Sequence, residues 1–110
     1  MDALVHALHT LRHLEDEVSL ARTKPSSQAL DTLAQVAENA GAARDQLESM
    51  SREGISPDRR TRLTRAIDHI DGVVSAAREA LEKPTTEEHL RGSLSDIVEH
   101  LLIATACAEE

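Results

Sequence analysis

The chain has 110 residues, of which 40% are hydrophobic and none is Phe, Trp or Tyr. Without these rings it can build neither a base-stacking platform for single-stranded nucleic acid nor an aromatic cage for a cation. Twelve Lys and Arg against 20 Asp and Glu give a formal net charge of −8, which disfavours nucleic acid and anionic membranes as partners.

Cysteine usage and hydropathy indicate the compartment. Cys107 is the single cysteine, which excludes an internal disulfide. No apolar run approaches the roughly 18 residues of a membrane span, and the N-terminus lacks a basic-then-apolar signal. We therefore expect a cytoplasmic protein with one domain, residues 1–110, and no cofactor.

Prolines at 25, 57 and 84 divide the chain into four segments. Ser26 and Ser27, just after Pro25, can cap the N-terminus of the second segment. At the start of the fourth, Thr85 and Glu88 form a capping box, in which each side chain can accept a hydrogen bond from the other residue's backbone amide.

The strongest boundary separates the second and third segments. Gly54 can take the left-handed conformation that ends many helices. Ser56 can cap the next helix, and Pro57 suits its first turn. We therefore predict a helix end before Gly54 and a helix start at Pro57.

Within each segment, apolar residues recur three and four positions apart, which places them on one face of an α-helix. No segment alternates polar and apolar residues as a half-buried strand would. We predict helices at about residues 2–22, 27–52, 57–83 and 86–108. The apolar faces contain Leu4, Ala7, Leu11, Leu14, Val18 and Ala21, then Leu33, Val36, Ala40, Ala43, Leu47 and Met50, then Leu63, Ile67, Ile70, Val74, Ala77 and Leu81, and finally Leu90, Leu94, Ile97, Leu101, Ala104 and Ala108.

Helices of this length with short connections pack antiparallel to their sequence neighbours. The predicted fold is all-α, an up-down antiparallel four-helix bundle. The alternative is a pair of long helical hairpins completed by dimerisation.

Three of the six histidines, His6, His9 and His13, lie on the first helix opposite its apolar face. His9 and His13 are spaced as a His-x3-His pair that can chelate zinc, but a structural site needs further ligands from another segment. We interpret these side chains as solvent-exposed, with His13 and Glu17 one turn apart as a weak surface pair.

The fourth helix carries a polar line beside its apolar face, formed by His89, Asp96, His100 and Cys107. Asp96 and His100, one turn apart, could ligate a metal. His100 lies about 10 Å along the axis from Cys107, too far to act as its catalytic base. No Glu-x-x-His motif of a bundle di-metal enzyme occurs. We predict neither an enzyme nor a metal centre, and retain His89, Asp96 and His100, with the His-x3-His pair, as alternative ligands.

The same helix is apolar around more than one face. Val98, Leu102 and Ile103 extend its apolar surface beyond the predicted core positions. Such a helix is either central to its bundle or covered by another molecule. We therefore predict a partner-binding surface at these residues, and a homodimer is the commonest arrangement.

Residues Glu88–Leu94, EHLRGSL, resemble the histidine-kinase dimerisation motif His-Glu-Leu-Arg-Thr-Pro-Leu. Leu90, Arg91 and Leu94 match it. Glu88 occupies the position of the phosphoacceptor histidine, and a carboxylate cannot replace the imidazole nucleophile. The resemblance covers seven residues and implies at most a degenerate phosphorelay relative.

Four arginines fall within seven residues at the start of the third helix: Arg59, Arg60, Arg62 and Arg65. Guanidinium groups suit carboxylates and phosphates, so the cluster is a candidate surface for an acidic or phosphorylated protein partner. The alternative is a solvated helix end with Asp58 and Glu53 as local partners.

We expect a small acidic helical-bundle protein with a binding or regulatory, adaptor-like role, acting through a helix surface and self-associating. The alternative is a metal-binding or degenerate phosphorelay-type protein that uses the histidines of the last helix.

Overall fold

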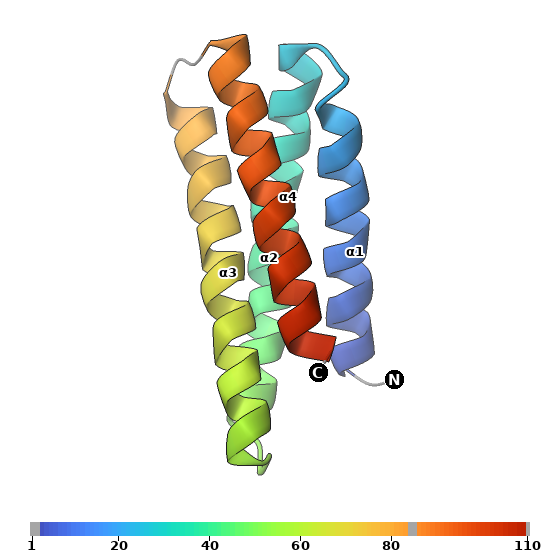
Figure 1. Cartoon of the computed structure of the whole chain (residues 1–110), viewed down its shortest axis with the longest axis vertical. Helices are drawn as coiled ribbons and strands as arrows, with labels where there is room; N and C mark the ends of the chain where they lie inside the picture. The colour runs from blue at the N-terminus through green and yellow to red at the C-terminus, as the bar shows by residue number, and fades with distance from the viewer. Residues whose placement is uncertain (1–2, 84–85, 110) are drawn as a thin grey trace.

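The computed structural model describes residues 3–83 and 86–109 (Figure 1). These residues form four α-helices and no strand: α1 (Ala3–Ala21), α2 (Ser26–Ser51), α3 (Pro57–Glu82) and α4 (Glu87–Glu109). Each helix begins and ends within one residue of its predicted bounds, which is the usual uncertainty of a helix end.

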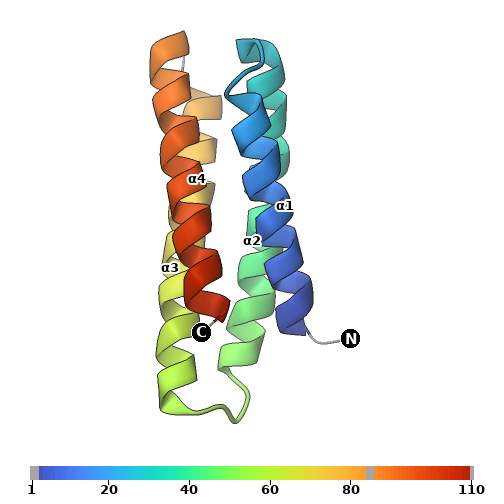
Figure 2. The ribbon, with the colours of Figure 1, turned by 45° about the vertical axis from the view of Figure 1, so that its right-hand side comes forward.

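The helices form an up-down antiparallel bundle, which confirms the predicted fold class. Each helix packs against its sequence neighbours, and α4 returns to pack against α1. One chain therefore closes the ring of four helices, and the alternative of hairpins completed by dimerisation is not needed. Figures 1 and 2 show the α2–α3 hairpin projecting beyond the start of α1 and the end of α4.

The core is built from aliphatic side chains on the predicted faces. Leu11, Leu33, Ile70 and Leu101, one from each helix, are completely buried. Val74 and Leu81, predicted in the core face of α3, are half-buried and exposed, and Val73 and Ala80 are buried instead. Among the described residues, no helix combines the length and the apolar character needed to cross a membrane.

The start of α3 follows the predicted capping pattern. The Ser56 hydroxyl accepts a hydrogen bond of 3.2 Å from the backbone amide of Arg59. Pro57 is the first residue of the helix, where its missing amide proton costs nothing. Ser56 and Pro57 therefore fix the point where the chain enters α3.

The predicted serine cap at the start of α2 is wrong, whereas the predicted capping box of α4 is not tested. Pro25, not Ser26 or Ser27, occupies the N-cap position of α2, and no side chain caps that end. The Pro25 carbonyl accepts from the Ala29 amide at 3.0 Å, so the helix starts one residue earlier than a serine cap would allow. The predicted box of Thr85 and Glu88 lies partly outside the described residues, because Thr85 is not among them.

Gly54 is not left-handed, because none of the described residues has a positive φ. Arg60 supplies the reason. Its Nε donates to the Ser51 carbonyl at 3.0 Å, and its Nη2 lies 3.4 Å from the Glu53 carbonyl. A guanidinium from α3 thus satisfies carbonyls at the end of α2, and the turn needs no left-handed residue.

Candidate functional site

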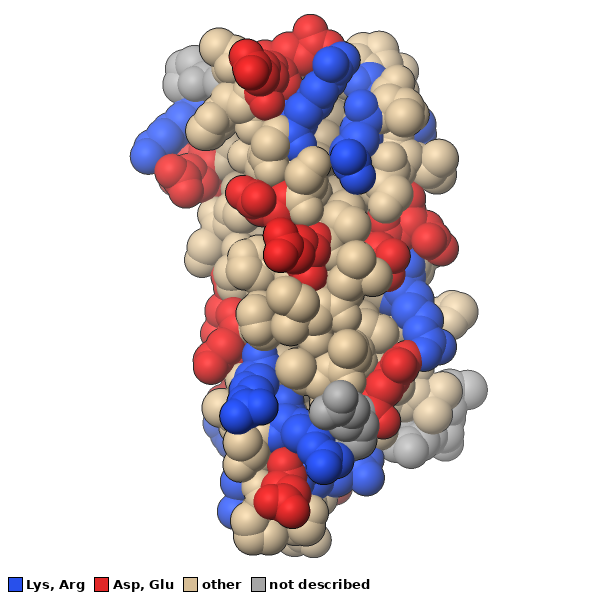
Figure 3. All heavy atoms as spheres, in the orientation of Figure 1, with Lys and Arg blue, Asp and Glu red and all other residues tan. Residues whose placement is uncertain are grey.

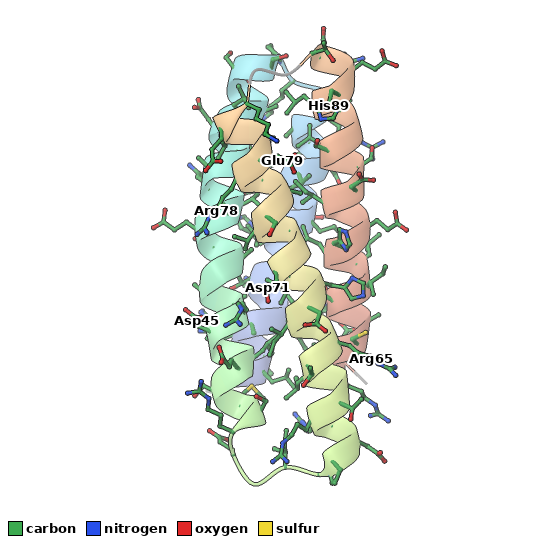
Figure 4. The ribbon with its side chains drawn as sticks, turned by 90° about the vertical axis from the view of Figure 1, so that its left-hand side faces the viewer. Asp45, Arg65, Asp71, Arg78, Glu79 and His89 are labelled. Atoms are coloured by element: carbon green, nitrogen blue, oxygen red, sulfur yellow. The ribbon has the colours of Figure 1, made fainter. Side chains whose placement is uncertain are left out.

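The outer seam between α3 and α4 contains a shallow hollow of about 300 Å³. Figure 4 shows Glu79 near the end of α3 and His89 near the start of α4, on the two sides of this seam. Both signs of charge are present in its wall, and the hollow opens to solvent, so it is an open polar depression and not an enclosed ligand site. The lining residues are Ala76, Glu79, Ala80, Lys83, His89, Ser93 and Asp96.

Further along the same seam, His69 of α3 meets His100 of α4. Their Nδ1 atoms are 3.1 Å apart, and both side chains are half-buried. The ring centroids are 5.3 Å apart with an interplanar angle of 41°. The two nitrogens therefore point toward one another across the helix interface.

A hydrogen bond between the Nδ1 atoms of His69 and His100 requires that one of them carry a proton and the other a lone pair. If both rings are neutral, one donates from Nδ1–H and the other accepts at Nδ1, so the two rings are different tautomers. With both rings charged, the hydrogen bond would be lost and two positive charges would face each other. The pair is therefore held together only in a singly protonated Nδ1–Nδ1 arrangement.

The His100 ring lies beside Gly72 of α3, which has no side chain to occupy that space. A Cβ atom placed on Gly72 would lie 3.6 Å from the Cε1 and Nε2 atoms of His100, which is ordinary van der Waals contact. The ring thus rests on the face of α3, one turn from His69. A side chain larger than a methyl group at position 72 would have to displace it.

The structure separates the residues of the predicted polar line on α4. His89 and Asp96 are exposed and line the hollow, whereas His100 turns toward His69. Cys107 is half-buried and carries no disulfide. Within residues 3–83 and 86–109, no three His, Cys, Asp or Glu side chains are close enough to hold a metal ion together.

The histidines of α1 are exposed to solvent. His6, His9 and His13 all lie on the outer surface, and the His13 Nε2 atom is 2.8 Å from a carboxylate oxygen of Glu17. No second helix supplies a ligand to His9 and His13 in the described part of the chain.

His69 was not singled out by the sequence analysis, which followed the polar line of α4 alone. Two features of the sequence could have indicated that His69 lies at the edge of a helix interface. His69 directly precedes the buried Ile70, and Gly72 follows three residues later on the flank of α3. The antiparallel register that brings residues 69 and 72 level with His100 follows only from the packing of the two helices.

The arginines at the start of α3 have different environments. Arg60 is used within the fold, on the carbonyls at the end of α2. Arg59 and Arg65 are exposed, and Arg62 is half-buried. Figure 4 shows Arg65 extending from α3 toward the side on which α4 ends, and Figure 3 shows basic side chains gathered near the start of α3. Arg60 is exposed as well, so all four arginines belong to the basic surface, and Arg60 also holds the turn between α2 and α3.

The apolar surface of α4 is exposed in part. Leu102 is 48% exposed and Ile103 is 36% exposed, whereas Val98 is half-buried. Figure 3 shows a strip without charged side chains on the lower half of α4, between charged groups above and below. This strip is on the side of α1, away from His69, because Leu102 and His100 point in directions about 160° apart on the helix.

A charged network across α2 and α3 was also absent from the sequence analysis. Arg44 donates from Nε to Asp71 at 2.7 Å and pairs with Glu48 one turn along α2. Arg52 also donates to Glu48, at 2.9 Å. The hydrogen bond from Arg44 lowers the pKa of Glu48, and those to Asp71 and Glu48 raise the pKa of Arg44. This network joins two helices and encloses no space for a ligand.

No family model matches the chain, and comparisons with curated proteins and with solved structures find no significant match.

Proposed function

We propose that this protein is a binding module that acts through the outer surface of α4 and associates with a second copy of itself. The observation that supports the proposal is the exposure of Leu102 and Ile103, two large aliphatic side chains at adjacent positions of one helix. In a chain without aromatic residues, such side chains are the largest apolar contacts that a surface can offer.

The order of residues along α4 fits a two-fold contact. Val98, Leu102 and Ala106 lie on successive turns, and Leu102 is the central one. In an antiparallel pair of α4 helices centred on Leu102, Val98 of each copy would face the small Ala106 of the other. Large side chains would thus pack against small ones, and the same surface would serve both copies.

The residues at the ends of the Val98–Leu102–Ala106 line create no charge repulsion in an antiparallel pair of α4 helices. Ser95 and Glu109 are equally far from Leu102, so they would face each other in the same antiparallel pair. A serine opposite a glutamate creates no like-charge contact. Because one pair of helix surfaces is small, the association should be weak and depend on concentration.

The experiment is light scattering after size-exclusion chromatography over a range of concentrations. We expect the wild type to gain mass toward a dimer, and Leu102→Glu with Ile103→Glu to remain a monomer at every concentration. Leu20→Glu on α1 is the matched control, because Leu20 is 59% exposed and lies outside the strip. A wild type that is monomeric throughout, or a Leu20 variant that loses mass equally, would refute this proposal.

A further inference from the structure

We propose that His69 and His100 together bind a divalent first-row transition-metal ion of the zinc type across the α3–α4 seam. The proposal does not depend on self-association, because the pair lies on the other side of α4 from Leu102. It also differs from the ligand sets suggested by the sequence, which did not contain His69.

The separation of the two nitrogens matches that of two ligands on one ion. Zinc binds histidine nitrogen at about 2.0–2.1 Å, so two nitrogens at a tetrahedral angle are about 3.3 Å apart, and at a right angle about 2.9 Å apart. The Nδ1 atoms of His69 and His100 are 3.1 Å apart, within this range. Because the nitrogens now face each other directly, both rings must turn about χ2, a soft torsion in histidine, to direct their lone pairs at an ion beside them.

The bundle core fixes the backbone of both histidines before any ion binds. Ile70 and Leu101, the neighbours of the two histidines in the sequence, are completely buried on their own helices. Gly72 carries no side chain and so leaves room for the His100 ring beside α3. Two ligands held on separate packed helices keep their spacing better than two ligands on a loop would.

Metal binding changes the protonation of one ring only. An ion needs the lone pair of Nδ1 on each ring, so the ring that now carries a proton on Nδ1 must carry it on Nε2 instead. Starting from two neutral rings, this change of tautomer proceeds through solvent at the half-exposed seam and releases no net proton. Imidazole is a good ligand for zinc, copper and nickel and a poor one for magnesium or calcium, which defines the class of ion.

Two protein ligands leave coordination positions that water would fill. No third His, Cys, Asp or Glu in residues 3–83 and 86–109 completes the site. Asp96 lies one turn from His100 along α4, and Arg65 lies one turn from His69 along α3. The site should therefore bind more weakly than a closed structural zinc site, and it would remain open to a further ligand.

Calorimetric titration with zinc chloride tests the proposal on the full chain without a histidine tag. We expect one zinc ion per chain, and an affinity that falls more than about tenfold in His69→Ala and in His100→Ala, the lower limit of losses known even for outer-shell residues. His89→Ala, on the same helix, and His9→Ala with His13→Ala, which removes the pair on α1, should keep the wild-type affinity.

Folding and stoichiometry are checked in the same samples. His69→Gln and His100→Gln, which keep a neutral polar side chain, replace the alanine variants if circular dichroism shows that those lose helix. Zinc should raise the thermal midpoint of the wild type and leave the midpoint of these variants unchanged. Absence of zinc binding, survival of binding in the variants of the pair, loss of binding with His9 and His13, or half an ion per chain with doubled mass would each overturn the proposal.

Discussion

Individual polar side chains in this protein act mainly by joining neighbouring helices. Arg44 links α2 to Asp71 of α3, Arg60 links α3 to the end of α2, and Arg12 pairs with Glu109 to link α1 to α4. Each of these contacts lies at the edge of the apolar core and not inside it. Surface ion pairs usually contribute little to stability, but a charge shared by several partners contributes more reliably.

Glu48 makes the contribution of one such network dependent on pH. Its pKa is lowered by the hydrogen bond from Arg44, so the folded protein binds a proton at this carboxylate less readily than the unfolded chain does. Stability from Glu48 is therefore fully present above the ordinary glutamate pKa of about 4.3 and is lost as the pH falls through its lower folded pKa.

We expect Glu48→Gln to lower the thermal midpoint at neutral pH, and the difference from wild type to shrink in acid and disappear below the folded pKa. Thermal unfolding followed by circular dichroism from pH 7 to pH 2 measures this. Asp45→Asn is the control, because Asp45 is 78% exposed and lies 3.5 Å from Arg44. An equal effect of both variants would show that Glu48 has no special role.

Helix ends show how far local sequence determines these elements. Ser56 followed by Pro57 defines a helix start by itself, since the cap needs only the hydroxyl and the amide three residues later. Ser27 lies near another proline, but there Pro25 takes the cap position and the serine hydroxyl is not used. The same residue types thus give different ends, depending on where the proline falls relative to the serine.

Substitution of Ser56 and of Ser27 distinguishes a serine that caps its helix from one that does not. Ser56→Ala should lower the free energy of unfolding by about 1 kcal/mol, because the Arg59 amide loses its partner. Ser27→Ala should change it by less than about 0.5 kcal/mol, as is usual for an exposed surface position. Urea unfolding of both variants measures the difference, and a larger cost at Ser27 would mean that its hydroxyl caps α2 after all.

At the level of pairs of helices, sequence alone was less informative. Apolar spacing predicted the four helices and most of their buried residues, Val74 and Leu81 excepted, because the period of a helix is local information. The meeting of His69 with His100 and of Arg44 with Asp71 depends on the register between helices, which the packed side chains of both partners determine together. The turn at Gly54 was mispredicted for the same reason, since Arg60 reaches it from the next helix.

The whole molecule depends on close packing of small and medium aliphatic side chains, because no aromatic ring is present to fill space. It measures 45 × 23 × 18 Å, so the core is a narrow column along the bundle axis. The buried aliphatic residues of all four helices form one continuous cluster. Truncation of one buried aliphatic residue should therefore lower the free energy of unfolding of the whole bundle.

Leu101 and Leu102 provide a matched test, since they are adjacent, chemically identical and 0% and 48% exposed. Leu101→Ala should lower the free energy of unfolding by about 2–5 kcal/mol, because it leaves a cavity in the core. Leu102→Ala should cost less than about 1 kcal/mol in dilute protein. Its effect should instead appear at high concentration, where the wild type gains thermal stability through association and the variant does not. Equal losses for both variants in dilute solution would mean that Leu102 belongs to the core, and the exposed surface on which self-association depends would not exist.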